Sequence, residues 1–280
     1  MTHFITVTVA AVLMTCFSAM SCNTSAESNM STESDMSVSA ENIVEAKAKV
    51  TARGKTVNIK GFDAIDNRSS VTIHYVQGSR YSLRVEEKGR DKSKLRREGT
   101  TLVIEPVKKN NSNAKTVIYL TSPEIKKIKN KGVMNFDAAT MKCSAMQWEN
   151  NGVINVDIDR LRCSGNVSIG NSGVAKWKGS VSAKTVSGDI SGVTDGTIKF
   201  EANTLDIHNS GVGTMELTFK GGSFDIETSG VSTMDVAVDC KKLKASNSGM
   251  GKLRISGTAD DTKIDGSGVS RINTSELNKL

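Results

Sequence analysis

Residues 209–250, NSGVGTMELTFKGGSFDIETSGVSTMDVAVDCKKLKASNSGM, contain two full copies of a 19-residue repeat and the start of a third. Each copy opens with a polar residue, a serine, a glycine and an apolar residue. The same glycine recurs in both directions along the chain, with spacings of 20, 21, 19, 19, 19, 19 and 19 residues. These repeat glycines are Gly132, Gly152, Gly173, Gly192, Gly211, Gly230, Gly249 and Gly268. So regular a register indicates a repeat architecture.

Apolar and polar residues alternate inside each copy. The position four after the glycine is occupied by Phe136, Val156, Trp177, Met215, Met234, Leu253 and Ile272. Apolar residues also stand six and eight after the glycine in most copies, and a period of two is typical of a strand with one buried face. A second short apolar pair follows, such as Phe224 and Ile226, and predicts a second strand.

A repeat of this length cannot bury its apolar face alone, but successive copies can stack about 4.8 Å apart. The sequence therefore predicts an all-β, single-domain parallel β-helix with coils of 19 residues. We predict a right-handed helix, because parallel crossovers nearly always are. We expect the repeat glycines to supply positive φ at a corner, and the valine after each glycine to pack inward. We expect hydrogen bonds along the stack, or within each turn, from Asn130, Asn150, Asn171, Asn209 and Asn247.

The chain before Gly132 alternates in the same way but less regularly. Candidate strands cover residues 56–59, 71–75, 81–86, 101–105 and 116–120. We assign residues 43–280 to one β-helical domain, with wider, irregular coils over 43–131 and regular coils over 132–280. A strand edge left uncovered at the far end would favour pairing with the chain's own tail or with another copy.

The N-terminus has the features of a bacterial export signal. An apolar run at residues 5–13 is too short to span a bilayer as a helix and is followed by small residues, so we predict a signal peptide over 1–21. Cys22 resembles the lipidated cysteine of bacterial lipoproteins. The alternatives are an ordinary cleaved signal or cleavage near Cys16. Residues 22–42 are acidic and rich in serine, which predicts a tether. Together these features predict an outer-membrane lipoprotein of the cell envelope, facing the periplasm or the outside.

Positive charge is concentrated in the first part of the predicted domain. Residues 43–131 contain 21 Lys and Arg against 9 Asp and Glu, whereas residues 132–280 contain 16 against 17. A basic face could contact anionic lipid, lipopolysaccharide phosphates or acidic glycans, or it could be a solvated surface. An exported chain with few aromatic residues is not expected to bind nucleic acid.

The repeat register also places acidic residues in columns. Asp206 and Asp225 stand at the same position of neighbouring copies, and Asp137 and Asp157 form a similar pair. Two such carboxylates could bind a cation or share a proton, or be solvated surface charges. Outside the predicted signal peptide only His74 and His208 remain, and no Cys or His spacing is typical of a metal site. We therefore expect no catalytic residues, no metal and no cofactor, with Asp206 and Asp225 as the candidate cation pair.

Cys143 and Cys163 both stand eleven residues after their glycines. Stacking would place them in adjacent coils at a separation that suits a disulfide, which export permits. Cys240 is then left as a small core residue.

Several ordered motifs before and around the first repeats resemble one family. They are Gly61-Phe62-Asp63-Ala64-Ile65, Ser70-Val71-Thr72-Ile73, Tyr81-Ser82-Leu83-Arg84-Val85, Gly99 to Ile104, and Val117 to Pro123 followed by Ile125, Ile128 and Gly132. In this order they resemble the head GIN domain family of auto-transporter adhesins, common in Bacteroidetes lipoproteins. The resemblance implies a β-helical fold, an exported location and no established catalytic activity.

Three functions follow as hypotheses. The first is a non-catalytic, membrane-anchored module that binds an unknown surface, glycan or protein ligand. The second is an envelope structural protein that forms homo-oligomers. The third is a carbohydrate-active β-helix enzyme, which would need clustered carboxylates and a basic residue on one face.

Overall fold

The computed structural model describes residues 54–88, 92–107, 115–267 and 271–279. These residues form strands and turns and contain no helix. The predicted all-β class is therefore confirmed. The strands are β1 (Lys55–Thr56), β2 (Ala64–Asn67), β3 (Ser70–Gln77), β4 (Ser82–Lys88), β5 (Ser93–Glu98), β6 (Thr101–Pro106), β7 (Lys115–Ser122), β8 (Lys127–Asn130), β9 (Val133–Cys143), β10 (Met146–Asn150), β11 (Val153–Cys163), β12 (Asn166–Asn171), β13 (Val174–Ile190), β14 (Val193–Asn209), β15 (Val212–Thr228), β16 (Val231–Asn247), β17 (Lys252–Gly266) and β18 (Arg271–Lys279).

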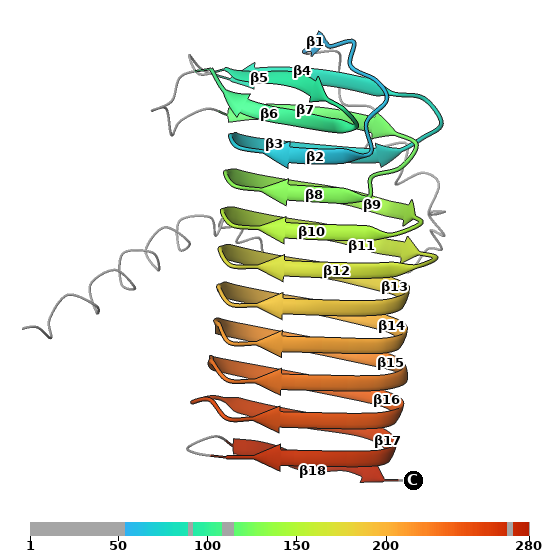
Figure 1. Cartoon of the computed structure of the whole chain (residues 1–280), viewed down its shortest axis with the longest axis vertical. Helices are drawn as coiled ribbons and strands as arrows, with labels where there is room; N and C mark the ends of the chain where they lie inside the picture. The colour runs from blue at the N-terminus through green and yellow to red at the C-terminus, as the bar shows by residue number, and fades with distance from the viewer. Residues whose placement is uncertain (1–53, 89–91, 108–114, 268–270, 280) are drawn as a thin grey trace, which may run out of the picture. The chain divides into compact units, whose positions relative to one another are not determined.

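From β8 onward the strands form a stack of parallel coils (Figure 1). We call the stack of β9, β11, the first halves of β13–β17 and β18 the first face. The second face consists of β8, β10, β12 and the second halves of β13–β17. From β13 to β16 each 17-residue strand passes from one face to the other without a break. Met215 pairs with Met234, and Leu217 with Val236, so equivalent positions form columns and the predicted parallel β-helix is confirmed.

The stack extends to the N-terminal side of Gly132. β2 pairs in parallel with β8, with Asn67 opposite Asn130, and β3 pairs in parallel with β9, with Ile73 opposite Phe136. On their other side β2 and β3 pair with β6 and β7, so a later part of the chain lies outside an earlier one. The antiparallel strands β1, β4 and β5 cover this end (Figure 1). The region expected to form wide coils thus consists of two parallel coils and an antiparallel cap.

On the first face the interior is filled by the even-numbered positions that follow each corner glycine. At the fourth position, Phe136, Val156, Met215, Met234 and Leu253 are at most 3% exposed, which confirms the predicted core column. Burial of each large side chain contributes about 1.5–3 kcal/mol. Trp148 of the second face packs edge-on between Phe136 and Trp177, with ring centroids 5.4 and 5.0 Å apart, and so joins the two faces across the core.

The corner glycines are required for a different reason from the one expected. None of those described has a positive φ; the positive-φ glycines lie elsewhere, for example at Gly61 and Gly99. Instead, a Cβ at Gly152, Gly173 or Gly249 would lie 2.0–2.1 Å from the carbonyl oxygen of the corner glycine one coil earlier. The expectation of positive φ was wrong, because the constraint is the close approach of stacked backbones rather than the turn itself. Gly268 lies outside the described residues.

A buried ladder of asparagine side chains runs along the same corner. Asn67 Nδ2 donates to Asn130 Oδ1 at 2.8 Å, Asn130 to Asn150 at 2.7 Å, and Asn150 to Asn171 at 2.7 Å. Asn171 Nδ2 then donates to Thr194 Oγ1 at 2.7 Å. The side-chain oxygens also accept from the backbone of their own turns, as at Gly152 and Gly173. Both arrangements expected for these asparagines therefore occur together.

The valine after each corner glycine faces outward. Val133, Val193, Val212 and Val231 are 41–51% exposed and, with the half-buried Val153 and Val174, stand in one column, which we call the valine column. Met250 follows the next corner glycine and is 66% exposed. The expectation that these residues pack inward was wrong. The even positions after the glycine face the core, so the first position must face solvent.

Candidate binding surfaces

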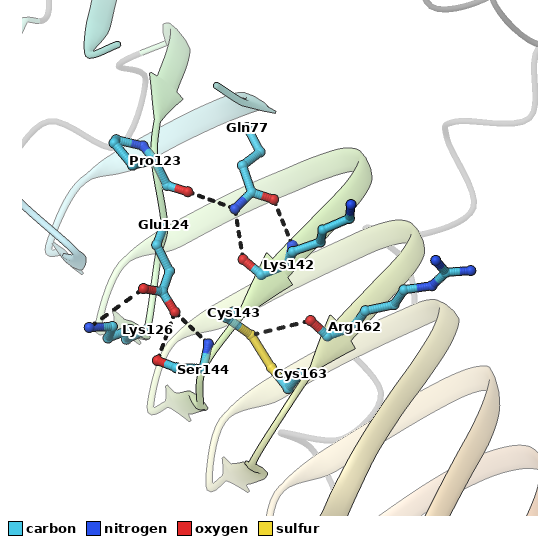
Figure 2. Close-up of a disulfide and its surroundings, with 9 residues drawn as sticks. All are labelled: Gln77, Pro123, Glu124, Lys126, Lys142, Cys143, Ser144, Arg162 and Cys163. Carbon is cyan, nitrogen blue, oxygen red and sulfur yellow. Dashed lines mark hydrogen bonds and ion pairs between the residues drawn. A yellow bond between two sulfur atoms is a disulfide. The ribbon is translucent and has the colours of Figure 1, made fainter. Parts of the chain in front are cut away.

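A disulfide joins Cys143 to Cys163 in adjacent coils, with a Cα–Cα distance of 4.7 Å (Figure 2). The bridge begins a corner column that continues with Ala183, Ala202, Gly221, Cys240 and Ala259. A Cβ at Gly221 would lie 1.8 Å from the Ala202 carbonyl oxygen, so this coil requires glycine at the corner, where the others have alanine or cysteine. Cys240 is buried there, and desolvation raises the pKa of its thiol. These properties fit a structural thiol rather than a nucleophile.

Side chains tie the two N-terminal coils to the coil that contains Cys143. Gln77 Nε2 donates to the carbonyl oxygens of Pro123, at 2.6 Å, and Lys142, at 2.7 Å, while its Oε1 accepts from the Lys142 backbone (Figure 2). Glu124 accepts hydrogen bonds from both the backbone and the hydroxyl of Ser144. The polar side chains of Gln77 and Glu124, which lie near the disulfide, thus hold neighbouring coils together.

The candidate cation pair lies on the second face. Asp206 and Asp225 are register neighbours. Lys244 Nζ donates to Asp225 Oδ2 at 2.7 Å, and this bond raises the pKa of Lys244. His208 approaches Asp206 and Glu227, at 3.2 and 3.4 Å. Within the described ranges no group of three or more His, Cys, Asp or Glu side chains is arranged to hold a metal ion. A cation at Asp206 and Asp225 would have to compete with Lys244 and with the contacts of His208.

The N-terminal part of the first face carries a stack that sequence reasoning missed. His74 of β3 lies opposite Tyr119 of β7, with ring centroids 5.2 Å apart, and Arg84 of β4 lies over the same tyrosine at 4.7 Å. On its other side His74 Nδ1 is 2.7 Å from Asp137 Oδ1. The three elements come together only because β7 and β4 lie outside β3, and no repeat pattern in the sequence indicates that.

Much of the basic charge on the second face near the cap is balanced by carboxylates. Lys127 and Lys129 lie 2.8 and 3.0 Å from Glu149, and hydrogen bonds from the two lysines lower the pKa of that carboxyl. Arg68 pairs with Asp66 in the same way, at 2.6 Å. The excess of basic residues therefore does not form one uninterrupted positive surface on this face.

A hollow of about 320 Å³ lies on the C-terminal part of the first face, over β15–β18. Its charged lining residues are Glu216, Asp235, Arg254 and Glu276. Two guanidinium nitrogens of Arg254 donate hydrogen bonds to the two carboxylate oxygens of Asp235. This ion pair lowers the pKa of Asp235 and raises that of Arg254. No motif in the sequence predicted this hollow.

The remaining predicted site lies outside the described residues, since Cys22 precedes residue 54. Among the described segments, none is a helix long and apolar enough to cross a membrane.

Comparison with known proteins identifies the family. Residues 61–221 and 214–279 match the family model described as "Putative auto-transporter adhesin, head GIN domain". No curated protein matches the chain. A crystal structure of a "putative adhesin" from Bacteroides fragilis NCTC 9343 is similar, with a TM-score of 0.51 and 20% identity, over 78% of this chain and 94% of that one.

Two further crystal structures are more distant. One is a "putative adhesin" from Parabacteroides merdae ATCC 43184, with 14% identity, a TM-score of 0.40 and coverage of 78% and 94%. The other is a "Putative lipid binding protein" from Parabacteroides distasonis ATCC 8503, with 18% identity, a TM-score of 0.48 and coverage of 79% and 95%. These likenesses concern the fold. The family match spans most of the chain, and the chain belongs to the family described as "Putative auto-transporter adhesin, head GIN domain".

Proposed function

We propose that this protein is a non-catalytic, lipid-anchored adhesin of the cell envelope that binds its partner through side chains on the two faces of the β-helix. Membership of an adhesin family supports an adhesin-like role at or outside the envelope. The observation that carries the proposal is the parallel pairing of each coil with its neighbours. Backbone groups on the faces are used in these ladders, so a partner that contacts a face is recognised by outward side chains rather than by strand addition.

The proposed anchor is Cys22, followed by the acidic residues 23–42 as a tether. Replacement of Cys22 by serine should move the protein from the membrane fraction to the soluble fraction and abolish its labelling by a fatty acid. Cys16→Ser is the matched control and should change neither property. Unchanged labelling of the Cys22→Ser variant would contradict this anchor.

Binding is tested with the full-length protein, purified in detergent, immobilised and incubated with intact cells and envelope fractions. The proposal expects saturable capture. A variant with glutamine at Lys60 and Arg80 tests the basic N-terminal part, and a variant with glutamine at Lys199 and Lys241 is the matched control, since all four side chains are exposed. No capture by the wild-type protein would contradict an adhesin. Equal capture by both variants would show that the N-terminal charge is not used.

A second candidate function is self-association, which the valine column favours. A second copy carries the same column with the same spacing, so two columns can pack side by side along their length. One column of side chains buries much less than the roughly 1,600 Å² of a standard interface, so association would be weak. Sedimentation velocity should then show dimers that increase with concentration and disappear on Val212→Lys. A strict monomer at high concentration would exclude this function.

The enzyme hypothesis predicts turnover of a polysaccharide. We expect no release of reducing ends or unsaturated products from acidic polysaccharides in the presence of Ca²⁺. Measurable turnover by the full-length protein would contradict a purely binding role.

A further inference from the structure

The hollow on the first face is formed by a change of register in the last coil. β17 and β18 pair residue for residue from Lys252 to Arg254, which lies opposite Asn273, but Ser256 then lies opposite Glu276. β18 thus holds one extra residue between Asn273 and Glu276, and Asn273 Oδ1 holds this bulge by accepting from the Ser275 backbone N–H at 2.9 Å. A β-bulge of this kind redirects side chains and is frequent next to functional sites.

The floor of the hollow is made of small side chains. Thr218, Ala237 and Ser256 stand in register in successive coils. Because these side chains are short, the longer side chains of the neighbouring column, Glu216, Asp235 and Arg254, form a wall beside them. Glu276, which follows the bulge, closes the C-terminal end of the hollow. The resulting volume of about 320 Å³ is at the small end of the range of ligand sites, and suits a short ligand or one segment of a longer one.

The charges of the hollow restrict what can bind. Three carboxylates, from Glu216, Asp235 and Glu276, surround a single guanidinium, that of Arg254. This excess of negative charge disfavours phosphates, sulfates and uronates. A cationic ligand cannot use Asp235, because Arg254 is bound through two nitrogen atoms to that carboxylate, and it would have to bind to Glu216 and Glu276 alone.

The remaining groups favour a ligand with many hydroxyls. Carboxylate, guanidinium and amide groups are planar and can each bind two adjacent hydroxyls, and Thr218, Ser256 and Ser275 add hydroxyls of their own. Among the described residues, the lining contains no aromatic ring for a peptide anchor. Glu216 is already partly fixed, because its Oε2 accepts from Thr197 Oγ1 at 3.4 Å.

From this geometry we propose that the hollow bounded by Glu216, Asp235, Arg254, Asn273 and Glu276 is a binding subsite for a neutral glycan. The proposal rests on the adhesin function proposed above and names its ligand class. Within it, the carboxylates accept hydrogen bonds from sugar hydroxyls, while Arg254 and the Asn273 amide donate to sugar oxygens.

The test uses the full-length protein in detergent on an array of neutral trisaccharides, comprising cellotriose, maltotriose, mannotriose and chitotriose, with trigalacturonic acid and tetralysine as charged probes. We expect binding to at least one neutral trisaccharide and weaker binding to both charged probes. Calorimetric titration of the best neutral trisaccharide then compares the wild-type protein with Glu216→Gln and Asn273→Ala. Each variant should weaken binding at least tenfold.

Asp206→Asn on the second face is the matched control and should leave the affinity unchanged. Failure to bind any neutral trisaccharide, stronger binding of tetralysine or trigalacturonic acid, or an equal affinity in Glu216→Gln and Asn273→Ala would overturn the subsite. Both test side chains are exposed, and circular dichroism of each variant should match the wild type, so a loss of binding reports on the hollow. Capture of intact cells by the wild-type protein without trisaccharide binding would retain the adhesin and reject this subsite.

Discussion

The asparagine ladder should account for a measurable share of the stability of the stack, and Asn150 is the position at which to test it. Asn150 is 3% exposed. Its Nδ2 donates to Asn171 Oδ1 at 2.7 Å and to the Gly152 carbonyl oxygen at 3.2 Å, and its Oδ1 accepts from Asn130 Nδ2 at 2.7 Å. Alanine at this position removes these contacts and interrupts the ladder on both sides.

The expected loss follows from the three hydrogen bonds that are removed. A hydrogen bond contributes about 0.5–1.5 kcal/mol net, and Asn130 and Asn171 keep their other partners, so the Asn150→Ala variant should lose about 3 kcal/mol in the free energy of unfolding. For a chain of this size that corresponds to a decrease in Tm of roughly 6–12 °C. The assay is thermal and urea unfolding of the full-length protein followed by circular dichroism.

Asn155 provides the matched control, because it lies in the same coil and is exposed. Asn155→Ala should change the free energy of unfolding by less than about 0.5 kcal/mol. An equal effect of the two substitutions would refute the reasoning, since it would mean that the buried ladder contributes nothing beyond an exposed amide.

Three further predictions concern the corners and one ion pair. Gly211→Ala should destabilise the protein severely, because its Cβ would lie 2.0 Å from a carbonyl oxygen of the previous coil, whereas Gly170→Ala, with its nearest contact at 3.6 Å, should be tolerated; urea unfolding compares them. Ala259→Cys should form a second disulfide with Cys240, its register partner, and thiol titration of the denatured variant should find both thiols lost. Lys127 and Lys129 lower the pKa of Glu149, so its ion pairs stabilise the fold fully above about pH 4.3, the ordinary pKa of a glutamate. This stabilisation is lost as the pH falls through the lowered pKa. The difference in the free energy of unfolding between wild type and Glu149→Gln should therefore shrink as the pH falls from about 4.3 through the lowered pKa.

The regular part of the fold could be predicted because burial repeats with a fixed register. The apolar position four after each glycine, the parallel stacking and the asparagine column all follow from one 19-residue period. The same period also determines that the valine column faces outward. A strand that buries the fourth, sixth and eighth positions must expose the first, and the expectation of inward valines ignored this parity.

The rest of the molecule depends on contacts that no period records. β6 and β7 lie outside β2 and β3, against the order of the chain, so the stack of Arg84, Tyr119 and His74 could not be inferred. The hollow depends on a bulge in β18 that moves Glu276 into the column of Ser256. The positions of the corner glycines could be read from the sequence. Whether a glycine is needed for a positive φ or for the close approach of two backbones could not, because this depends on the distance between stacked coils.

Protease treatment of living cells tests the adhesin most directly, because an adhesin must face outward. If the protein is anchored at Cys22 and displayed on the surface, protease added to intact cells should cut between the anchor and residue 54 and release a fragment that contains the coils. A periplasmic protein of known location, followed in the same cells, reports that the outer membrane stays closed. Protection of the full-length protein until the outer membrane is permeabilised would contradict the adhesin and place the protein inside the envelope.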